Sequence, residues 1–140
     1  MPTLYGAHTA PRATTPPGLV DGSLQGGRVR VYRERITLAG QGLADTIVVA
    51  LPSAGETFLC GTLTADVSLG TTQLAIGTAA VPGKYRAAAP HTVIDTPVNF
   101  GRVAAQGARL AADEIVQVSL TLAALPTTGT LIVDLYFTQS

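Results

Sequence analysis

The chain has 140 residues, a formal net charge of zero at pH 7, and 46% hydrophobic against 13% charged residues. A chain of this length is expected to form one domain that buries about two-thirds of its unfolded surface. The zero net charge argues against a general nucleic-acid binder, whose affinity depends on clustered Lys and Arg that neutralise phosphates. No apolar run approaches the roughly 20 residues of a membrane helix, and the N-terminus lacks a signal-peptide pattern, so we expect no membrane partner. The single cysteine excludes an intrachain disulfide and is typical of cytoplasmic synthesis.

Residues 1–27 differ from the rest of the chain in composition. They contain four of the nine prolines and show no alternation of apolar and polar residues. Proline fixes φ and removes a backbone donor, which disfavours helix and favours extended geometry. Because such a segment cannot bury a core by itself, we predict an extended N-terminal arm that becomes ordered against a partner protein. Its expected partner-binding residues are Tyr5, Arg12, Leu19 and Val20.

A basic strand is predicted next, over residues 28–38. Residues 1–35 carry five Arg against two acidic groups, a net charge of +3, and residues 36–140 carry four basic against seven acidic groups, a net charge of −3. The arginines of the strand could clamp acidic side chains of a partner by planar two-point contacts. They could equally protect an exposed edge strand from aggregation, and both interpretations remain open. The four that we add to the expected partner-binding residues are Arg28, Arg30, Arg33 and Arg35.

The apolar residues of this basic strand change phase along it. Val29 and Val31 share one face, whereas Tyr32, Ile36 and Leu38 share the other. We therefore predict that the strand contains a bulge or passes from one sheet to another.

Further strands are predicted from period-two alternation at 45–51, 57–67, 73–77, 84–88, 98–100, 115–123 and 130–138. The last two are joined by a connection of hairpin length at 125–129 and are expected to pair antiparallel. Only residues 103–113 could hold a helical turn. The side chains expected to face the core are Ile47, Val49, Leu51, Leu59, Leu63, Ala65, Val67, Leu74, Ile76, Val116, Val118, Leu120, Leu122, Leu131, Val133, Leu135 and Phe137.

This pattern predicts an all-β fold. Many short strands with frequent turn signals favour an antiparallel two-sheet sandwich, jelly-roll-like or immunoglobulin-like, because a parallel sheet would need crossover helices. The expected organisation is an extended arm over residues 1–27 and a jelly-roll-like β-sandwich domain over residues 28–140.

Reactive groups do not form a recognisable catalytic or metal-binding pattern. His8, His91 and Cys60 are far apart in sequence and lack the spacing of zinc ligands or of a nucleophilic triad. Asp113 and Glu114 are neighbours and, on an extended chain, point to opposite faces, unlike a glycosidase pair. Cys60 is interpreted as a small buried hydrophobe. We predict no catalytic residue, no metal site and no cofactor.

Four stretches of the chain resemble the small proteins that decorate or cement the heads of tailed bacteriophages: TLTADVSLGTTQLAIGT at 62–78, GKYRAAA at 83–89, DTP at 95–97 and ALPTTGTL at 124–131. The resemblance implies a jelly-roll-like domain without enzymatic activity. It also implies a place in the virion, on the outer surface of an icosahedral shell of HK97-type major capsid protein.

Combined with this resemblance, the residues suggest a mechanism. The arm and the basic strand would hold a neighbouring capsid subunit, while the sandwich would supply a rigid body and a face for self-association. A homodimer is favoured over a trimer because closed twofold pairing is the commonest symmetry. A carbohydrate- or receptor-binding sandwich on a virion is an alternative, although sugar platforms usually expose aromatic residues and this chain has no Trp. A small enzyme would require a deep pocket of converging polar groups.

Overall fold

The structure is a computed structural model that describes residues 27–139. This part of the chain contains eight β-strands in two antiparallel four-stranded sheets, and no helix. The predicted all-β two-sheet sandwich is therefore confirmed. The arm predicted over residues 1–27 lies, except for Gly27, outside the described residues. The strands are β1 (Arg28–Thr37), β2 (Thr46–Ala50), β3 (Thr57–Ala65), β4 (Gln73–Gly77), β5 (Arg86–Pro90), β6 (Val98–Phe100), β7 (Val116–Thr121) and β8 (Thr130–Gln139).

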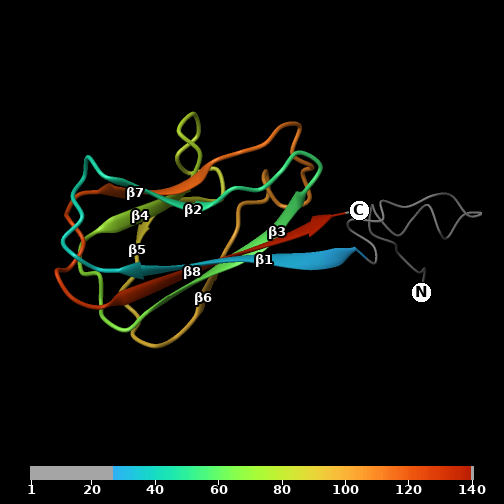
Figure 1. The fold of residues 1–140 in the computed structure, drawn as a ribbon. Coiled ribbons are helices and arrows are strands. Elements are labelled where there is room, and N and C mark those ends of the chain that lie inside the picture. Colours follow the sequence, from blue (N-terminus) through green and yellow to red (C-terminus); the bar gives the residue numbers. More distant parts are fainter. Residues whose placement is uncertain (1–26, 140) are drawn as a thin grey trace, which may run out of the picture.

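The strand order is that of a jelly roll. The first sheet has the order β1-β8-β3-β6 and the second has the order β2-β7-β4-β5. Each strand pairs antiparallel with its counterpart counted from the other end of the chain: β1 with β8, β2 with β7, β3 with β6, and β4 with β5. Such a chain is a long hairpin rolled into two layers. Figure 1 shows the layers stacked, with the start of β1 and the end of β8 together at one end of the sandwich.

Alternation along the central strands builds the core between the sheets. All four predicted inward side chains of β8, from Leu131 to Phe137, are fully buried. The Phe137 ring lies 5.4 Å from the Phe58 ring, 5.5 Å from the Tyr32 ring and 6.1 Å from the Tyr85 ring, measured between centroids. Edge-on contacts of this kind add to the stabilisation from burial alone. Most of the aromatic residues of the described chain are thus concentrated in one part of the core.

The predicted hairpin between the last two strands is wrong. β7 lies in the second sheet and β8 in the first, so residues 122–129 cross from one layer to the other. Leu122, expected to face the core, instead adopts a φ of 71° and is 71% exposed, which ends the alternation. The crossing segment is held by the loop after β1, because Leu125 N–H donates to the Gln41 carbonyl and Gly40 N–H to the Pro126 carbonyl.

The predicted bulge or sheet switch in the basic strand is also wrong. β1 pairs with β8 in one unbroken register from Arg28 to Thr37. Val29 and Val31 are on the outer face of the first sheet and are about half exposed. The apparent change of phase comes from these two outward apolar side chains, not from the backbone.

Register irregularities occur instead in other strands, where they explain two further errors. β2 shifts between Val48 and Ala50, and Leu51, expected to face inward, is 64% exposed. β3 shifts between Phe58 and Cys60, so that Leu59 lies in the irregularity and is only half-buried. An extra residue in one strand reverses the face of the side chains that follow.

The segment from 101 to 115 runs without regular structure between β6 and β7. Its one helical feature is a hydrogen bond from Gln106 N–H to the Arg102 carbonyl, at 3.0 Å, within a series of turns. In residues 27–139 there is no helix long and apolar enough to cross a membrane.

Candidate functional site

β1 is an edge strand, with one side paired to β8 and the other side open. In an antiparallel pair, the backbone groups of successive residues point alternately toward and away from the partner strand. Leu38 N–H donates to the Gly129 carbonyl at 2.9 Å, which places the even-numbered residues on the paired side. The open side therefore carries the backbone N–H and C=O groups of the odd-numbered residues from Val29 to Thr37.

Two polar side chains close the far end of this open edge. Arg35 N–H donates to Glu34 Oε1 at 3.2 Å, and Gln41 Nε2 donates to the Thr37 carbonyl at 3.0 Å. These side-chain groups occupy positions that the peptide groups of a neighbouring strand would otherwise fill. Among residues 27–139, nothing occupies the part of the edge from Val29 to Arg33.

The four arginines of β1 do not form one cluster. Arg33 and Arg35 share the outer face with the exposed valines, whereas Arg28 and Arg30 lie on the side that faces the second sheet. Arg33 binds Asp134 of β8 by two points, with Nε to Oδ1 at 2.7 Å and Nη2 to Oδ2 at 2.8 Å. This hydrogen-bonded pairing with Asp134 raises the pKa of Arg33. Arg33 is therefore already paired within its own sheet.

Arg30 belongs to a second polar group, centred on the buried carboxylate of Glu56. The Tyr32 hydroxyl donates to both carboxylate oxygens, at 2.7 and 2.8 Å, and Ser53 N–H donates at 2.5 Å. Arg30 Nη1 lies 3.5 Å from Oε1 of Glu56, whose side chain is fully buried. Burial, followed by the contact with Glu56, raises the pKa of Tyr32. This group attaches the start of β1 to the loop before β3.

Arg28 and Arg35 have no side-chain partner among residues 27–139. Both are exposed, at opposite ends of the open edge. Of the predicted partner-binding residues, these two are therefore the ones with guanidinium groups available to another molecule. Four others lie outside the described residues: Tyr5, Arg12, Leu19 and Val20.

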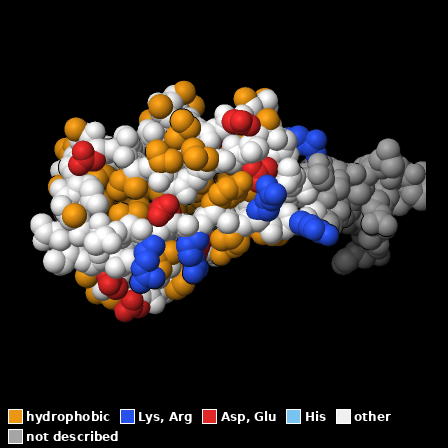
Figure 2. Space-filling model, in the orientation of Figure 1, with side chains coloured by type: hydrophobic (Ala, Val, Ile, Leu, Met, Phe, Trp, Pro, Cys, Tyr) orange, Lys and Arg blue, Asp and Glu red, His pale blue; other side chains and the backbone are white. Residues whose placement is uncertain are grey.

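A shallow groove of about 360 Å³ lies between the edges of the two sheets, lined by residues 32–34 of β1 and by residues 48–51 around the end of β2. Val48 and Leu51 are exposed there, at 47% and 64%. Figure 2 shows this side of the molecule, with basic side chains along β1 and hydrophobic side chains next to them toward the second sheet. The edge thus combines free backbone groups, positive charge and apolar surface.

Sequence reasoning identified the arginines but missed their acidic partners. Glu56 and Asp134 determine which arginines are paired and which are available. Asp134 stood out as the one charged residue in an otherwise uncharged alternating strand, which is a usable signal. No local pattern indicates Glu56, because it meets β1 only through the fold.

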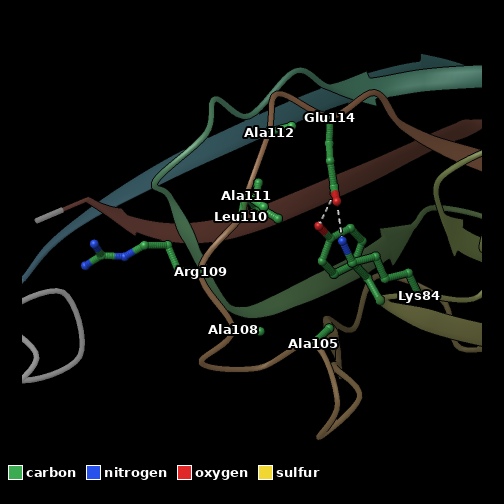
Figure 3. A pocket seen from close by; sticks show the side chains of 9 residues that line it. Lys84, Ala105, Ala108, Arg109, Leu110, Ala111, Ala112 and Glu114 are labelled. Carbon is green, nitrogen blue, oxygen red and sulfur yellow. Dashed lines mark hydrogen bonds and ion pairs between the residues drawn. The ribbon is translucent and has the colours of Figure 1, made fainter.

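A second polar cluster connects the 101–115 segment with the residues before β5, beside an alanine-rich pocket of about 360 Å³ (Figure 3). The hydroxyl of the buried Tyr85 donates to Glu114 Oε1 at 2.5 Å, and Lys84 Nζ forms an ion pair with Glu114 Oε2. Burial, together with Glu114, raises the pKa of Tyr85 strongly. In Figure 3, Glu114 and Lys84 point toward each other while Arg109 points away. Both oxygens of the carboxylate are occupied, so the cluster joins the 101–115 segment to the start of β5 and leaves no free base.

The remaining candidate reactive residues lie apart from one another. His91 is 3% exposed, and within the described chain its Nε2 atom has no hydrogen-bond partner. Burial and the charge of Arg86 lower the pKa of His91. Cys60 is a free, half-buried thiol on β3. Among residues 27–139, no three His, Cys, Asp or Glu side chains are grouped so as to hold a metal ion.

No known family model and no curated protein sequence matches this chain. Chains from solved bacteriophage capsids share its fold. One, from the capsid asymmetric unit of cyanophage Pam1, aligns with a TM-score of 0.68 and 18% identity over 81% of this chain and 86% of its own length. Another, from the capsid of Ralstonia phage GP4, aligns with a TM-score of 0.63 and 17% identity over the same shares of the two chains. A third, from the acidic stable capsid of Helicobacter pylori bacteriophage KHP30, gives a TM-score of 0.58 and 9% identity over 80% and 89%.

Proposed function

We propose that this chain is a structural protein of a bacteriophage virion, which binds the outer surface of the icosahedral head and cements neighbouring major capsid subunits of the HK97 type. The observation that supports this proposal best is the shared fold with chains of phage capsids, which covers at least four-fifths of both partners in each alignment. At these identities the likeness concerns the fold, and the function is our inference from it.

The distribution of polar groups supports a binding role over a catalytic one. Glu56, Asp134 and Glu114 each have both carboxylate oxygens engaged by neighbouring groups. Paired in this way, they hold strands and loops together and do not present a base to a substrate. The molecule described here offers an open strand edge in place of a reactive cleft.

Cementing requires many modest contacts that must break together. A body with a rigid two-sheet core can bridge two subunits if one part grips each of them, and linked contacts then resist separation more strongly than either alone. In the proposed arrangement the arm of residues 1–27 holds the capsid subunit, and β1, with Arg28 exposed where that arm joins the sandwich, holds a neighbouring chain. A second copy of the chain supplies a further contact, as a homodimer.

The alternative of a carbohydrate- or receptor-binding module receives less support. Sugar platforms expose aromatic rings, whereas Phe58, Tyr85 and Phe137 are fully buried and Tyr32, Phe100 and Tyr136 are half-buried. The described surface therefore lacks an exposed aromatic platform.

Binding to shells tests the proposal directly. Purified protein is mixed with undecorated shells of its phage, and co-sedimentation is measured over a range of concentrations. We expect saturable binding at a fixed ratio to the major capsid protein, visible by cryo-EM as density outside the shell. Absence of binding to both expanded and unexpanded shells, together with absence of the protein from purified virions, would reject the proposal.

A deletion separates the contribution of the arm from that of the sandwich. Removing residues 1–27 is expected to abolish co-sedimentation while leaving the thermal unfolding midpoint nearly unchanged, since the sandwich has a buried core built from its own residues. The matched control is a variant in which residues 1–27 are replaced by a Gly/Ser sequence of equal length. Full occupancy by either variant would contradict a role for the arm.

A further inference from the structure

We propose that two copies of this chain associate through the open edges of their β1 strands, around a twofold axis that passes beside Val31. The two first sheets then merge into one continuous sheet. This inference deepens the homodimer of the proposed function and rests on it for the expectation that the chain self-associates. It goes further by naming the surface, the register and the residues that determine the register.

β1 differs from the other three strand edges of the sandwich. β6 has only three residues, and β2 and β5 have five each and pair with an irregular register. β5 also ends in Pro90, which has no N–H to donate. Short length, irregularity and proline are the usual protections of an edge against pairing. β1 has ten residues, an unbroken register and no proline. Its protection is charge, from four arginines and Glu34, and a second β1 strand can overcome this only in a register that pairs opposite charges.

Backbone geometry restricts how two β1 edges can pair. Only the odd-numbered residues direct N–H and C=O groups to the open side, so an added strand must form its hydrogen bonds with them. When two identical strands pair antiparallel about a twofold axis, one residue lies directly opposite its own copy in the partner. The position of that central residue defines the register. Residues 29 to 34, which span the open part of the edge and its margin, are the candidates for this central residue.

Charge excludes four of these six registers, because like charges directly opposite each other destabilise a strand pair. A centre at Val29 places Arg28 opposite Arg30, and a centre at Arg30 or Arg33 places that arginine opposite itself. A centre at Glu34 places two glutamates together and also Arg33 opposite Arg35. The registers centred on Val31 and Tyr32 remain.

The register centred on Val31 gives an acidic partner to Arg28, whose guanidinium has none among residues 27–139. It places Arg28 opposite Glu34 of the partner subunit, twice by symmetry, and Arg30 opposite the partner's Tyr32, where a guanidinium can lie over the ring. Val31 meets the partner's Val31, and the stem of Arg33 covers the partner's Val29. Two valines that are 56% and 53% exposed in the single chain thereby become covered.

The register centred on Tyr32 fits less well. It needs the Thr37 carbonyl for pairing, and that carbonyl already accepts from Gln41. It places Arg28 opposite the partner's Ile36, which is buried. It also pairs Glu34 with Arg30, which already lies 3.5 Å from Glu56. The register centred on Val31 is therefore the one that pairs both the Arg28 guanidinium and the open backbone groups of residues 29–33.

A disulfide test reads out the register directly. In a Cys60→Ala background, which removes the only natural cysteine, Val31→Cys is compared with Val29→Cys, a substitution of equal type and similar exposure. Residues facing each other in a hydrogen-bonded pair have Cα atoms about 5.5 Å apart, within the range of a disulfide. Two copies of residue 29 would be offset by four residues, roughly 13 Å along the strands. We expect mild oxidation to give a covalent dimer for Val31→Cys and at least tenfold slower formation for Val29→Cys.

Charge reversal tests the same register without a covalent bond, by sedimentation equilibrium of the full-length protein. Arg28→Glu and Glu34→Arg should each weaken the dimer about tenfold or more, since two symmetric attractive pairs become repulsive. The double variant Arg28→Glu/Glu34→Arg should recover wild-type affinity to within a few-fold. The matched control is Arg35→Glu on the same strand, which faces only Gly27 of the partner subunit and should leave the affinity nearly unchanged.

Removal of a single donor completes the test. Val31→Pro deletes an N–H on the open side, where edge strands tolerate proline, and leaves the hydrogen bonds to β8 intact. The variant should be monomeric with a retained cooperative unfolding transition.

The inference is overturned if the wild-type chain is monomeric at high concentration. Equal crosslinking at positions 29 and 31, or failure of the double charge swap to restore the dimer, overturns it equally. Shell binding is measured separately, so a monomer that still decorates shells would reject the β1 dimer and leave the proposed function in place. A β1 dimer that binds no shell would support the β1 dimer and reject the proposed function.

Discussion

The two sheets of the sandwich share one core but differ in what they present to the outside. The first sheet contains three strands of nine or ten residues and one of three, and one of its three pairings is irregular. It also holds two buried carboxylate pairings near its edge strand and most of the aromatic packing. The second sheet has strands of five and six residues, and two of its three pairings are irregular. The difference indicates that the first sheet holds the rigid and specific part of the molecule, whereas the second mainly completes the core.

The largest effect on the free energy of unfolding is expected from core substitutions, which compare the contributions of the two sheets. Phe137→Ala should lower the free energy of unfolding by about 3–5 kcal/mol, because the ring is fully buried against three other aromatic rings. Leu120→Ala in the second sheet should cost about 2–3 kcal/mol. Urea denaturation measures both. Equal losses would show that the two sheets contribute alike.

Two glycines, one in each sheet, are expected to give the next largest effects on stability. A Cβ at Gly77 of β4 would lie 2.3 to 2.7 Å from three backbone atoms of residues 81–84, which cannot move without shifting the chain. At Gly61 of β3 it would lie 2.3 and 2.6 Å from two atoms of the Phe100 ring, which can shift, and 2.8 Å from one backbone atom, the Asp134 carbonyl oxygen. Gly77→Ala should therefore cost about 3 kcal/mol and Gly61→Ala about 1–2 kcal/mol, within the usual cost of overpacking. The opposite order would show that the loop over β4 is the softer element.

The buried carboxylate below β1 should show a clear difference between two substitutions. Glu56→Ala leaves the Tyr32 hydroxyl and Ser53 N–H without their acceptor, a cost of about 1–3 kcal/mol. Glu56→Gln keeps one acceptor oxygen and should cost less. Hydrogen exchange of β1 amides, measured alongside unfolding, should accelerate in Glu56→Ala more than exchange in β7. Uniform acceleration would argue that Glu56 supports the whole core and not the edge strand alone.

The smallest expected effect is a dependence of stability on pH. Because the pKa of His91 is lowered from its ordinary 6.5 in the fold, the unfolded chain takes up the proton first as the pH falls. Stability should thus be unaffected by His91 above about pH 7 and should decline below about pH 6.5, a loss of a few degrees in the melting temperature by pH 5. His91→Gln should flatten this slope. An unchanged slope in His91→Gln would assign the effect to carboxylates.

The sequence correctly predicted which side chains are buried in strands where apolar and polar residues alternate strictly. Four inward residues of β8 follow a strict period of two, and all four are buried. Alternation fails where the backbone inserts a residue or adopts a left-handed conformation. The irregularities beside Leu51 and Leu59, and the φ of Leu122, have no signature in apolar pattern, so side chains expected inside lie at the surface.

Strand pairing was harder to predict than strand position. The sequence distance between β7 and β8 is that of a hairpin, but the jelly roll places them in different layers. In this topology β8 pairs with β1, more than ninety residues away, and the preference depends on the total fit of two sheets rather than on the connecting residues. The candidate site has the same character: the arginines were visible in the sequence, whereas Glu56 and Asp134 reach them only through long-range pairing.

The shared end of β1 and β8 has a practical consequence for engineering. Arg28 lies opposite Gln139, so a polypeptide fused after the C-terminus would emerge beside the segment that precedes β1. At the other end of β8, about 30 Å away at the rise of an extended chain, Thr127 and Thr128 form an exposed turn. An antigen or label displayed on a particle should be inserted between those two threonines, because they lie at the opposite end of β8 from the attachment end of the same chain and away from the centre of the β1 edge.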